Sequence, residues 1–386
     1  MSEIPQAPTT GARRRRALSV VMVVFLLIGT GWIAWWYFES RGHETTDNAY
    51  VGGNLVQVTP RVAGTVVAID ADDTDLVDAG QTLVRLDPSD ARIALEQAEA
   101  QLAQAVREAR VLYAKDTALE AAVAQRKVEL SRAEDDLARR APLVASGAVS
   151  KEDLQHARDA VAAARAALKT ANEQLATSRA LTQGVRVGEQ PSVQRAAARV
   201  REAFLAVQRD TIPAPVRGYV AKRSVQVGQQ VAPGMPLMAV VPLDDVWVDA
   251  NFKEVQLRDM RIGQPVTLSA DLYGSKVEYR GRVAGLAAGT GGAFALLPPQ
   301  NATGNWIKVV QRLPVRIELD RKQLAEHPLR VGLSMEVDVD VRDASGPQLA
   351  KAPVKGPVYA TTAFDEQAAA ADARVGEIIA ANLGTR

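Results

Sequence analysis

Two stretches of the sequence, RVAGTVVAIDADDTDLVDAGQTLVRLDP at residues 61–88 and PVRGYVAKRSVQVGQQVAPGMPLMAVVP at residues 215–242, align with each other without a gap. Each copy alternates short apolar runs with polar turns and carries a V-x-x-G-x-x-L segment, a pattern typical of β-strands joined at glycines. One copy alone would leave an apolar face and open strand edges in water. We therefore predict that residues 61–88 and 210–244 fold together as one small split β-sandwich. The shared residues are Val62/Val216, Gly64/Gly218, Val66/Val220, Val77/Val231, Gly80/Gly234, Leu83/Leu237 and Pro88/Pro242. The four glycines of the two glycine pairs, Gly64, Gly80, Gly218 and Gly234, are the predicted structural turns.

The segment between the copies, residues 89–209, has the pattern of a long helical hairpin. It opens on Asp87-Pro88-Ser89-Asp90, which supplies an N-cap and a first-turn carboxylate. From Ser89 to Ala141 it has no glycine or proline. Apolar residues then recur every seven positions, which predicts two helices packed as an antiparallel coiled coil. A break at residues 182–191 interrupts the second arm. The repeating positions are Leu95, Leu102, Ala109, then Val123, Leu130, Leu137, Val144, and after the turn Leu154, Val161, Leu168 and Leu175.

An uncharged and mostly apolar run at residues 17–38 precedes the repeats. As a helix it would extend roughly 33 Å, about the thickness of a bilayer core. A cleaved signal peptide is the alternative, but its apolar region is shorter, and bulky aromatic residues close this run where a cleavage site would stand. The arginines at 13–16 place residues 1–16 in the cytoplasm by the positive-inside rule. We predict a retained transmembrane helix with the main body on the far side of the membrane.

Residues 245–342 are rich in alternating apolar positions and predict a small antiparallel β-barrel domain. Residues 39–60 are expected to be an entry strand or linker, and residues 343–386 a mobile C-terminal tail with a possible short helix near 366–381. The alternating positions are Val266, Leu268, Ala270 and Leu272, then Val315, Ile317 and Leu319, and finally Met335, Val337, Val339 and Val341.

The composition excludes several classes of function. Forty-six Lys and Arg residues against forty-five Asp and Glu leave a net charge of +1, which does not favour nucleic-acid binding. The chain has no cysteine and only three histidines, far apart in sequence, so thiolate chemistry is excluded and a metal site is disfavoured. The GTGG run at 289–292 lacks the Gly-Lys-Ser/Thr of a phosphate-binding loop. We predict a protein that is not an enzyme and holds no cofactor.

The half-motifs resemble those of lipoyl and biotinyl domains. Those carriers need a lysine at the hairpin between their halves, and the first lysine of this chain is Lys115, so the resemblance indicates a scaffold. An anchor, a split lipoyl-like repeat and an inserted hairpin together resemble the HlyD-class membrane fusion proteins, and more closely the adaptors of major-facilitator multidrug pumps. That resemblance covers about residues 13–342 and rests on TDNAYV at 46–51, WVDANFKE at 247–254 and FALLPPQNATGNWIKVVQR at 294–312.

The resemblance implies a mixed α and β, elongated protein with a single N-terminal transmembrane helix, a split lipoyl-like β-sandwich, an antiparallel coiled-coil hairpin and a small antiparallel β-barrel. It further implies a periplasmic adaptor in the bacterial inner membrane that joins a major-facilitator transporter to a TolC-type outer-membrane channel. Six copies would self-associate around a trimeric channel and enclose a route for hydrophobic or toxic small molecules. Two alternatives stay open: an adaptor of an ABC-type protein exporter, and a cell-envelope structural coiled coil.

The turn of the hairpin carries the spacing Arg139-x3-Leu143-x6-Ser150, which resembles the tip motif of adaptors that dock onto TolC-type channels. Ser150 with Asp153 also forms an N-capping pattern, so its role is open between docking and capping. A second candidate is the loop at 285–306. It is either an inter-strand loop packed on its barrel or a contact with a neighbouring subunit or transporter, through Phe294, Leu296, Leu297 and Trp306.

Overall fold

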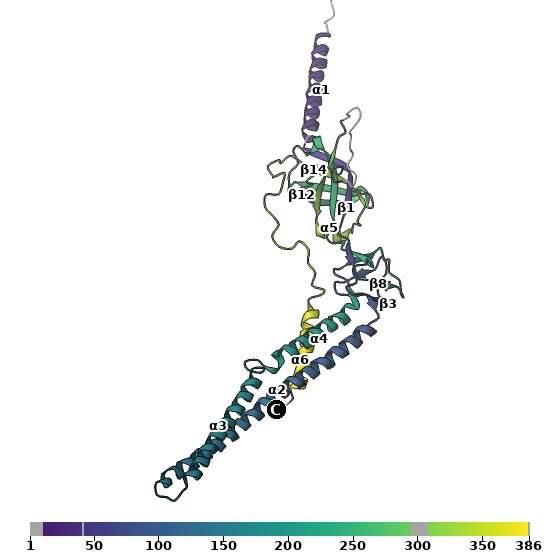
Figure 1. The fold of residues 1–386 in the computed structure, drawn as a ribbon. Helices are drawn as coiled ribbons and strands as arrows, with labels where there is room; N and C mark the ends of the chain where they lie inside the picture. The colour runs from purple at the N-terminus through teal and green to yellow at the C-terminus, as the bar shows by residue number, and fades with distance from the viewer. Residues whose placement is uncertain (1–10, 41, 295–307, 385–386) are drawn as a thin grey trace, which may run out of the picture.

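The computed structural model describes residues 11–40, 42–294 and 308–384. The molecule is elongated, with helix α1 (Gly11–Ser40) at one end and the turn of a helical hairpin at the other, and two β-domains lie between them (Figure 1). This confirms the mixed α and β, elongated architecture with a hairpin and a barrel. Within the part of the chain that is described, no helix combines the length and the apolar character needed to cross a membrane.

The two sequence repeats form one domain of two facing sheets. Strand β3 of the first copy pairs with β8 of the second at Gly64↔Val231, and β4 pairs with β7 at Leu76↔Tyr219. Both copies also contribute to one buried apolar core. Neither copy completes its sheets alone, because each sheet contains strands from both. The sheets are β2 (Val56–Val58), β9 (Met238–Val241), β7 (Gly218–Ala221), β4 (Leu76–Val77), and β6 (Thr211–Pro213), β5 (Thr82–Leu86), β3 (Gly64–Ile69), β8 (Gln230–Val231).

The hairpin consists of α2 (Ser89–Arg140), the short η1 (Ala141–Val144), α3 (Lys151–Arg179), η2 (Val187–Glu189) and α4 (Pro191–Arg209). Helix α2 is long enough to extend about 78 Å. The predicted heptad positions lie on the face where the arms meet: Leu102, Ala109, Val161 and Leu175 are buried, and the other seven are half-buried. The apolar seam therefore holds the arms together along their length.

The break in the second arm is held by hydrogen bonds of Tyr113 and Gln190. The hydroxyl of Tyr113 on α2 donates to the carbonyl of Val185 in the break. Gln190, which is only 6% exposed, donates through Nε2 to the Tyr113 hydroxyl and to the Leu181 carbonyl, each at 3.0 Å. These bonds satisfy backbone groups that the helix interruption leaves without helical partners.

The second β-domain is a closed six-stranded barrel in the order β1-β10-β13-β12-β11-β14. Its strands are β1 (His43–Gly52), β10 (Trp247–Lys253), β13 (Arg312–Leu319), β12 (Glu278–Leu286), β11 (Pro265–Ala270) and β14 (Ser334–Asp340). Three short elements accompany them: η3 (Glu254–Leu257), η4 (Gly274–Lys276) and α5 (Arg321–Glu326).

Residues 39–60 are expected to be an entry strand or linker, and most of this segment's first half is strand β1, which belongs to the barrel. Strand β1 lies between β10 and β14, and Ala49 pairs with Ala250 on one side and with Met335 on the other. Ala49 and Val51 are buried in the barrel core, which gives this segment its place in the sheet. Leu272 differs from expectation: it follows the end of β11 and is 56% exposed, whereas the other predicted alternating positions are buried or half-buried.

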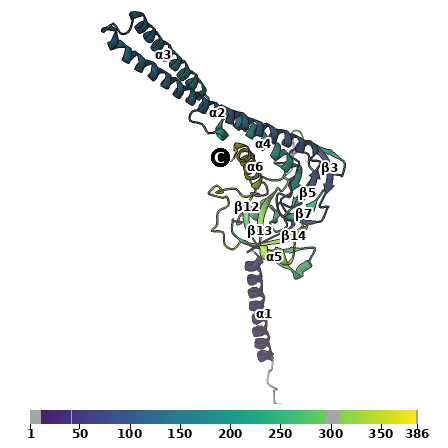
Figure 2. The same cartoon turned by 90° about the horizontal axis from the view of Figure 1, so that it is seen from below.

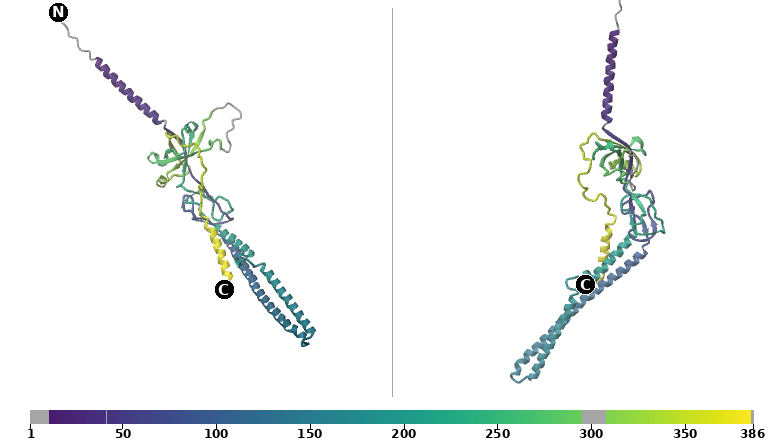
Figure 3. Two further views of the ribbon diagram at one scale, coloured as in Figure 1. Left: turned by 90° about the vertical axis from the view of Figure 1, so that its left-hand side faces the viewer. Right: turned by 45° about the horizontal axis from the view of Figure 1, so that its top comes forward.

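The C-terminal tail is not free along its whole length. It ends in helix α6 (Glu366–Leu383), which lies against α2 and α4 near the base of the hairpin (Figures 2 and 3). Val375 and Ile378 of α6 are 4% and 9% exposed. The expectation of a mobile tail is therefore corrected for α6, because its apolar face adds to the core of the hairpin base.

Candidate functional site

The tip of the hairpin is the part of the molecule farthest from α1 (Figures 1 and 3). Helix α2 ends where Ala141 donates its backbone N–H to the carbonyl of Leu137, and Pro142 follows in η1. Proline has no N–H and cannot continue the helical ladder. Gly147, with φ of +74°, then takes the left-handed conformation that reverses the chain.

Ser150 caps the second arm. Its extended backbone (φ −74°, ψ 155°) precedes α3, and its Oγ accepts the backbone N–H of Asp153 at 2.9 Å. The same hydroxyl donates to Oδ2 of Asp153 at 2.6 Å, and this bond holds the pKa of the Asp153 carboxyl below its usual range. The predicted capping role of Ser150 is confirmed by these contacts.

Leu143 lies on η1 with 45% of its surface exposed. Its carbonyl accepts the Ser146 hydroxyl at 2.9 Å and the backbone N–H of Ala148 at 3.2 Å. The backbone at Leu143 is thus fixed by the turn, while its apolar side chain meets solvent. This contact of Ser146 was not predicted from the sequence. The local signal for it is a serine directly before Gly147, because serine hydroxyls often hydrogen-bond the backbone of a turn.

Arg139 stands at the end of α2 with its side chain 70% exposed. Its Nη2 is 3.5 Å from Oδ1 of Asp136, whereas Nε of Arg140 is 2.9 Å from Oδ2 of the same carboxylate. Arg140 is therefore the closer partner, and exposed pairs of this kind contribute little to stability. The guanidinium of Arg139 is available for a new partner.

The tip thus combines an exposed apolar side chain, a loosely paired guanidinium and a rigid capped turn. A forked guanidinium can donate two hydrogen bonds to a carboxylate or to carbonyl groups. An apolar side chain on a fixed backbone can insert between helices of a partner at low entropic cost. The arrangement is suited to binding a protein surface.

The four predicted structural glycines separate into two kinds. Gly80 and Gly234 have φ of +83° and +82°, a backbone conformation that residues with a side chain rarely adopt. Gly218 lies in a strand where an added Cβ would meet the Val241 carbonyl oxygen at 2.6 Å. At Gly64 an added Cβ would meet only the Leu86 side chain, at 3.2 Å.

The second candidate, the loop after β12, is described only in part. Phe294 is 73% exposed. Leu296, Leu297 and Trp306 lie outside the described residues. The described part of the loop follows strand β12 of the barrel, so the structure does not bring Phe294 together with the hairpin tip (Figure 1).

Comparison with known proteins identifies relatives of this chain. The chain is 49% identical over 91% of its length to "Multidrug export protein EmrA" of Escherichia coli (strain K12), and covers 90% of that protein. The chain belongs to the EmrA family. A second relative, "Fatty acid resistance protein FarA" of Neisseria gonorrhoeae, is 52% identical over 88% of this chain and 86% of its own length.

The hairpin itself matches the model of the EmrA α-helical hairpin domain over residues 89–210. A solved structure described as that of the periplasmic adaptor protein EmrA is 18% identical to this chain, covers 78% of it and 98% of its own length, and has a TM-score of 0.39.

Proposed function

We propose that this chain is a non-enzymatic periplasmic adaptor of a multidrug efflux system. The observation that carries the proposal is its membership of the EmrA family, with 49% identity over nearly the full length of a multidrug export protein. Relatives named for export and resistance favour this role over the adaptor of a protein exporter and over a structural coiled coil.

Residues 17–38 are proposed to anchor the chain in the bacterial inner membrane. The support is the uncharged run itself, the arginines at 13–16 before it, and the continuous helix α1 that contains both. In this arrangement residues 1–16 lie in the cytoplasm and the β-domains and hairpin lie in the periplasm. The aromatic residues at 35–38 then stand at the periplasmic interface of the membrane.

The proposed partners stand at the two ends of the molecule. Beside the anchor, an EmrB-like major-facilitator transporter supplies the transport energy. At the opposite end, Arg139, Leu143 and Ser150 dock onto a TolC-type outer-membrane channel, with six copies of the adaptor around it. The support for tip docking is the exposed Leu143 on a rigid turn and the loosely paired Arg139.

The proposed cargo is a hydrophobic or otherwise toxic small molecule. One relative is named for drugs and the other for fatty acids, and both classes are largely apolar. The loop with Phe294, Leu296, Leu297 and Trp306 is proposed to contact a neighbouring subunit or the transporter. The support is the apolar character of these residues and the exposure of Phe294.

The proposal is tested by drug resistance in the native host after deletion of the chromosomal copy. The full-length wild-type chain is expected to restore resistance to hydrophobic drugs. The double variant Arg139→Asp, Leu143→Ser is expected to lose it, because a leucine buried against a channel helix contributes about 1.5–3 kcal/mol and the reversed charge repels the carboxylates it would bind. Membrane insertion and helix content should stay normal.

The same arm offers a matched control. Val128, 51% exposed, and Arg132, also exposed, have the same four-residue spacing as the tip pair in reverse order. The variant Val128→Ser, Arg132→Asp is expected to restore resistance like the wild type. Full resistance with the tip variant would contradict docking through the tip, and unchanged resistance after deletion of the chromosomal copy would contradict the efflux function.

A further inference from the structure

The C-terminal segment, residues 343–383, runs past all the domains that follow α1. At the barrel, the buried Gln264 donates through Nε2 to the Asp343 carbonyl at 2.8 Å, and the Ile262 N–H donates to the Pro347 carbonyl at 3.0 Å. The segment then leaves the barrel, passes the two-sheet domain and reaches the hairpin base as α6 (Figures 1 and 3).

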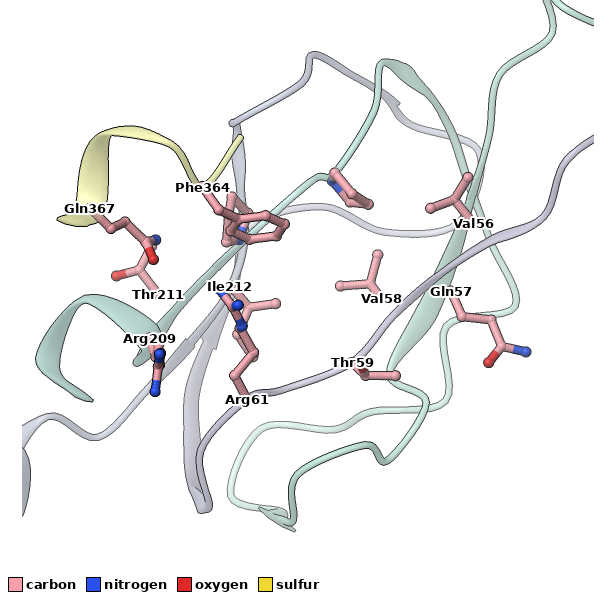
Figure 4. A pocket seen from close by; sticks show the side chains of 12 residues that line it. Val56, Gln57, Val58, Thr59, Arg61, Arg209, Thr211, Ile212, Phe364 and Gln367 are labelled. Carbon is pink, nitrogen blue, oxygen red and sulfur yellow. The ribbon is translucent and has the colours of Figure 1, made fainter. Parts of the chain in front are cut away.

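At the two-sheet domain, the segment is held by a polar and an aromatic contact. The Thr361 hydroxyl donates to the Pro215 carbonyl at 2.5 Å. The guanidinium carbon of Arg61 lies 4.9 Å from the centre of the Phe364 ring, within the range of a cation–π contact. Figure 4 shows Phe364 beside Arg61 and Ile212 at a pocket of about 260 Å³, so the ring is one wall of this pocket.

At the hairpin base, α6 completes an apolar core that α2 and α4 leave open. Val375 and Ile378 are buried in one cluster with Leu102 of α2 and with Ala197 and Val200 of α4. Both arms of the hairpin therefore contribute to the surface that α6 covers.

Ion pairs flank this core on both arms. Arg374 binds the Glu99 carboxylate of α2 with two nitrogens, at 2.7 and 2.9 Å, and this raises the pKa of the guanidinium. Asp372 of α6 accepts Nε of Arg201 on α4 at 2.5 Å. A bidentate guanidinium–carboxylate pair fixes orientation as well as distance. Helix α6 is thus set in one register on the hairpin.

The backbone passes between the hairpin and the two-sheet domain twice, at Asp87 and at Asp210. The backbone N–H of Leu86 donates to the Asp210 carbonyl at 2.8 Å, so the two crossings lie side by side. Because the two attachment points are adjacent, the hairpin can rotate relative to the two-sheet domain about the line that joins them, and only local contacts oppose this rotation. A third attachment at a distance from that line removes this freedom.

We propose that residues 361–383 form a strap that fixes the direction of the hairpin relative to the two-sheet domain. One end of the strap is held by Phe364 and Thr361 on the two-sheet domain, and the other by α6 on the hairpin base. From Asp87 to the tip the hairpin extends about 80 Å, so a rotation of about 10° at this junction moves the tip by about 14 Å. For an adaptor of the proposed function, the strap sets where the tip can meet a channel.

The test uses the purified full-length protein and does not depend on transport. Because the chain has no cysteine, spin labels can be placed through Val227→Cys on the two-sheet domain and Ala118→Cys on the hairpin, both at exposed positions. Double electron–electron resonance then measures the distribution of distances between the labels. The strapped protein is expected to give a narrow distribution.

Val375→Asp is expected to release α6, raise its amide exchange at least tenfold and broaden the distance distribution. Ala373→Asp places the same charge at an exposed position of the same helix and should change neither. Fast exchange of α6 in the wild type, or a narrow distribution after its release, would overturn the proposal.

A second variant acts at the other end of the strap and leaves the hairpin core intact. The double variant Thr361→Ala, Phe364→Ala is expected to broaden the distance distribution while α6 keeps its slow exchange, because the two contacts that hold this end on the two-sheet domain are both removed. Tyr359→Ala, at a residue 57% exposed, is the control and should keep the narrow distribution. A narrow distribution in the double variant would show that α6 merely stabilises the hairpin, and would overturn the strap.

Discussion

Gly218 has the least room for a side chain among the four structural glycines of the two-sheet domain. An added methyl group would meet backbone atoms of Val241 and Pro242, which cannot move without breaking the sheet, whereas at Gly64 it would meet only the flexible Leu86. We expect Gly218→Ala to lower the free energy of unfolding of this domain by about 2–3 kcal/mol, and Gly64→Ala by about 1 kcal/mol. Amide exchange of β7 and β9 measures the difference, and equal losses would contradict the assignment.

Substitutions at Ser150 test its capping role at the tip separately from docking. Ser150→Ala removes the acceptor for the Asp153 N–H and is expected to destabilise the first turn of α3 by about 1 kcal/mol. Ser150→Asn keeps an oxygen acceptor in the cap and should retain that stability. Amide exchange of residues 151–156 measures the cap. If Ser150→Asn lost the cap as fully as Ser150→Ala, the hydrogen bond would not be its cause.

At the scale of single residues, the sequence predicted those features that depend only on neighbouring residues. The Ser150 cap followed from a serine three residues before an acid, because a cap involves only neighbours. The exposure of Arg139 depends on the competition of Arg140 for Asp136, and the fixed backbone of Leu143 depends on the whole turn. The clash at Gly218 arises from a strand that is close only after folding.

At the scale of elements, strand β1 makes the barrel depend on residues near the N-terminus. It pairs with β10 on one side and β14 on the other, so its removal opens the barrel and exposes a core that includes Val248 and Val337. We expect a chain lacking residues 1–39, exported by a cleavable signal, to keep a folded barrel. A chain lacking residues 1–53 should lose it.

Limited proteolysis and amide exchange of β10 and β14 distinguish the two deletions. Equal protection in both chains would mean that β1 is dispensable for the barrel. Loss of protection already in the chain lacking residues 1–39 would mean that α1 belongs to the folded body and not to an anchor.

Elements with strong local patterns were predictable, and elements defined by distant partners were not. The hairpin follows from its seven-residue spacing and the split sandwich from its internal repeat. Strand β1 lies about 200 residues from β10, and its TDNAYV segment carries little alternation of its own. Helix α6 is rich in alanine, so its apolar face became evident only where it packs on α2 and α4.

At the scale of the whole molecule, helix α1 and the hairpin tip lie at opposite ends (Figure 1). Helix α1 extends from the barrel at one end, and the tip lies at the far end of a hairpin whose first arm alone extends about 78 Å (Figure 1). A molecule this long can join two partners that are too far apart to contact each other directly. The strap and the ordered break keep that length from being lost to bending.

The central claim, that the hairpin tip binds an outer-membrane channel, is tested most directly by photo-cross-linking in living cells. A photoreactive amino acid replaces Leu143 in the full-length chain, and a second strain carries it at Val128 on the same arm. After illumination, the adducts are purified and their second component is identified by mass spectrometry. The account predicts an adduct with an outer-membrane channel protein from position 143 and none from position 128. No channel adduct from position 143, or equal adducts from both positions, would contradict it.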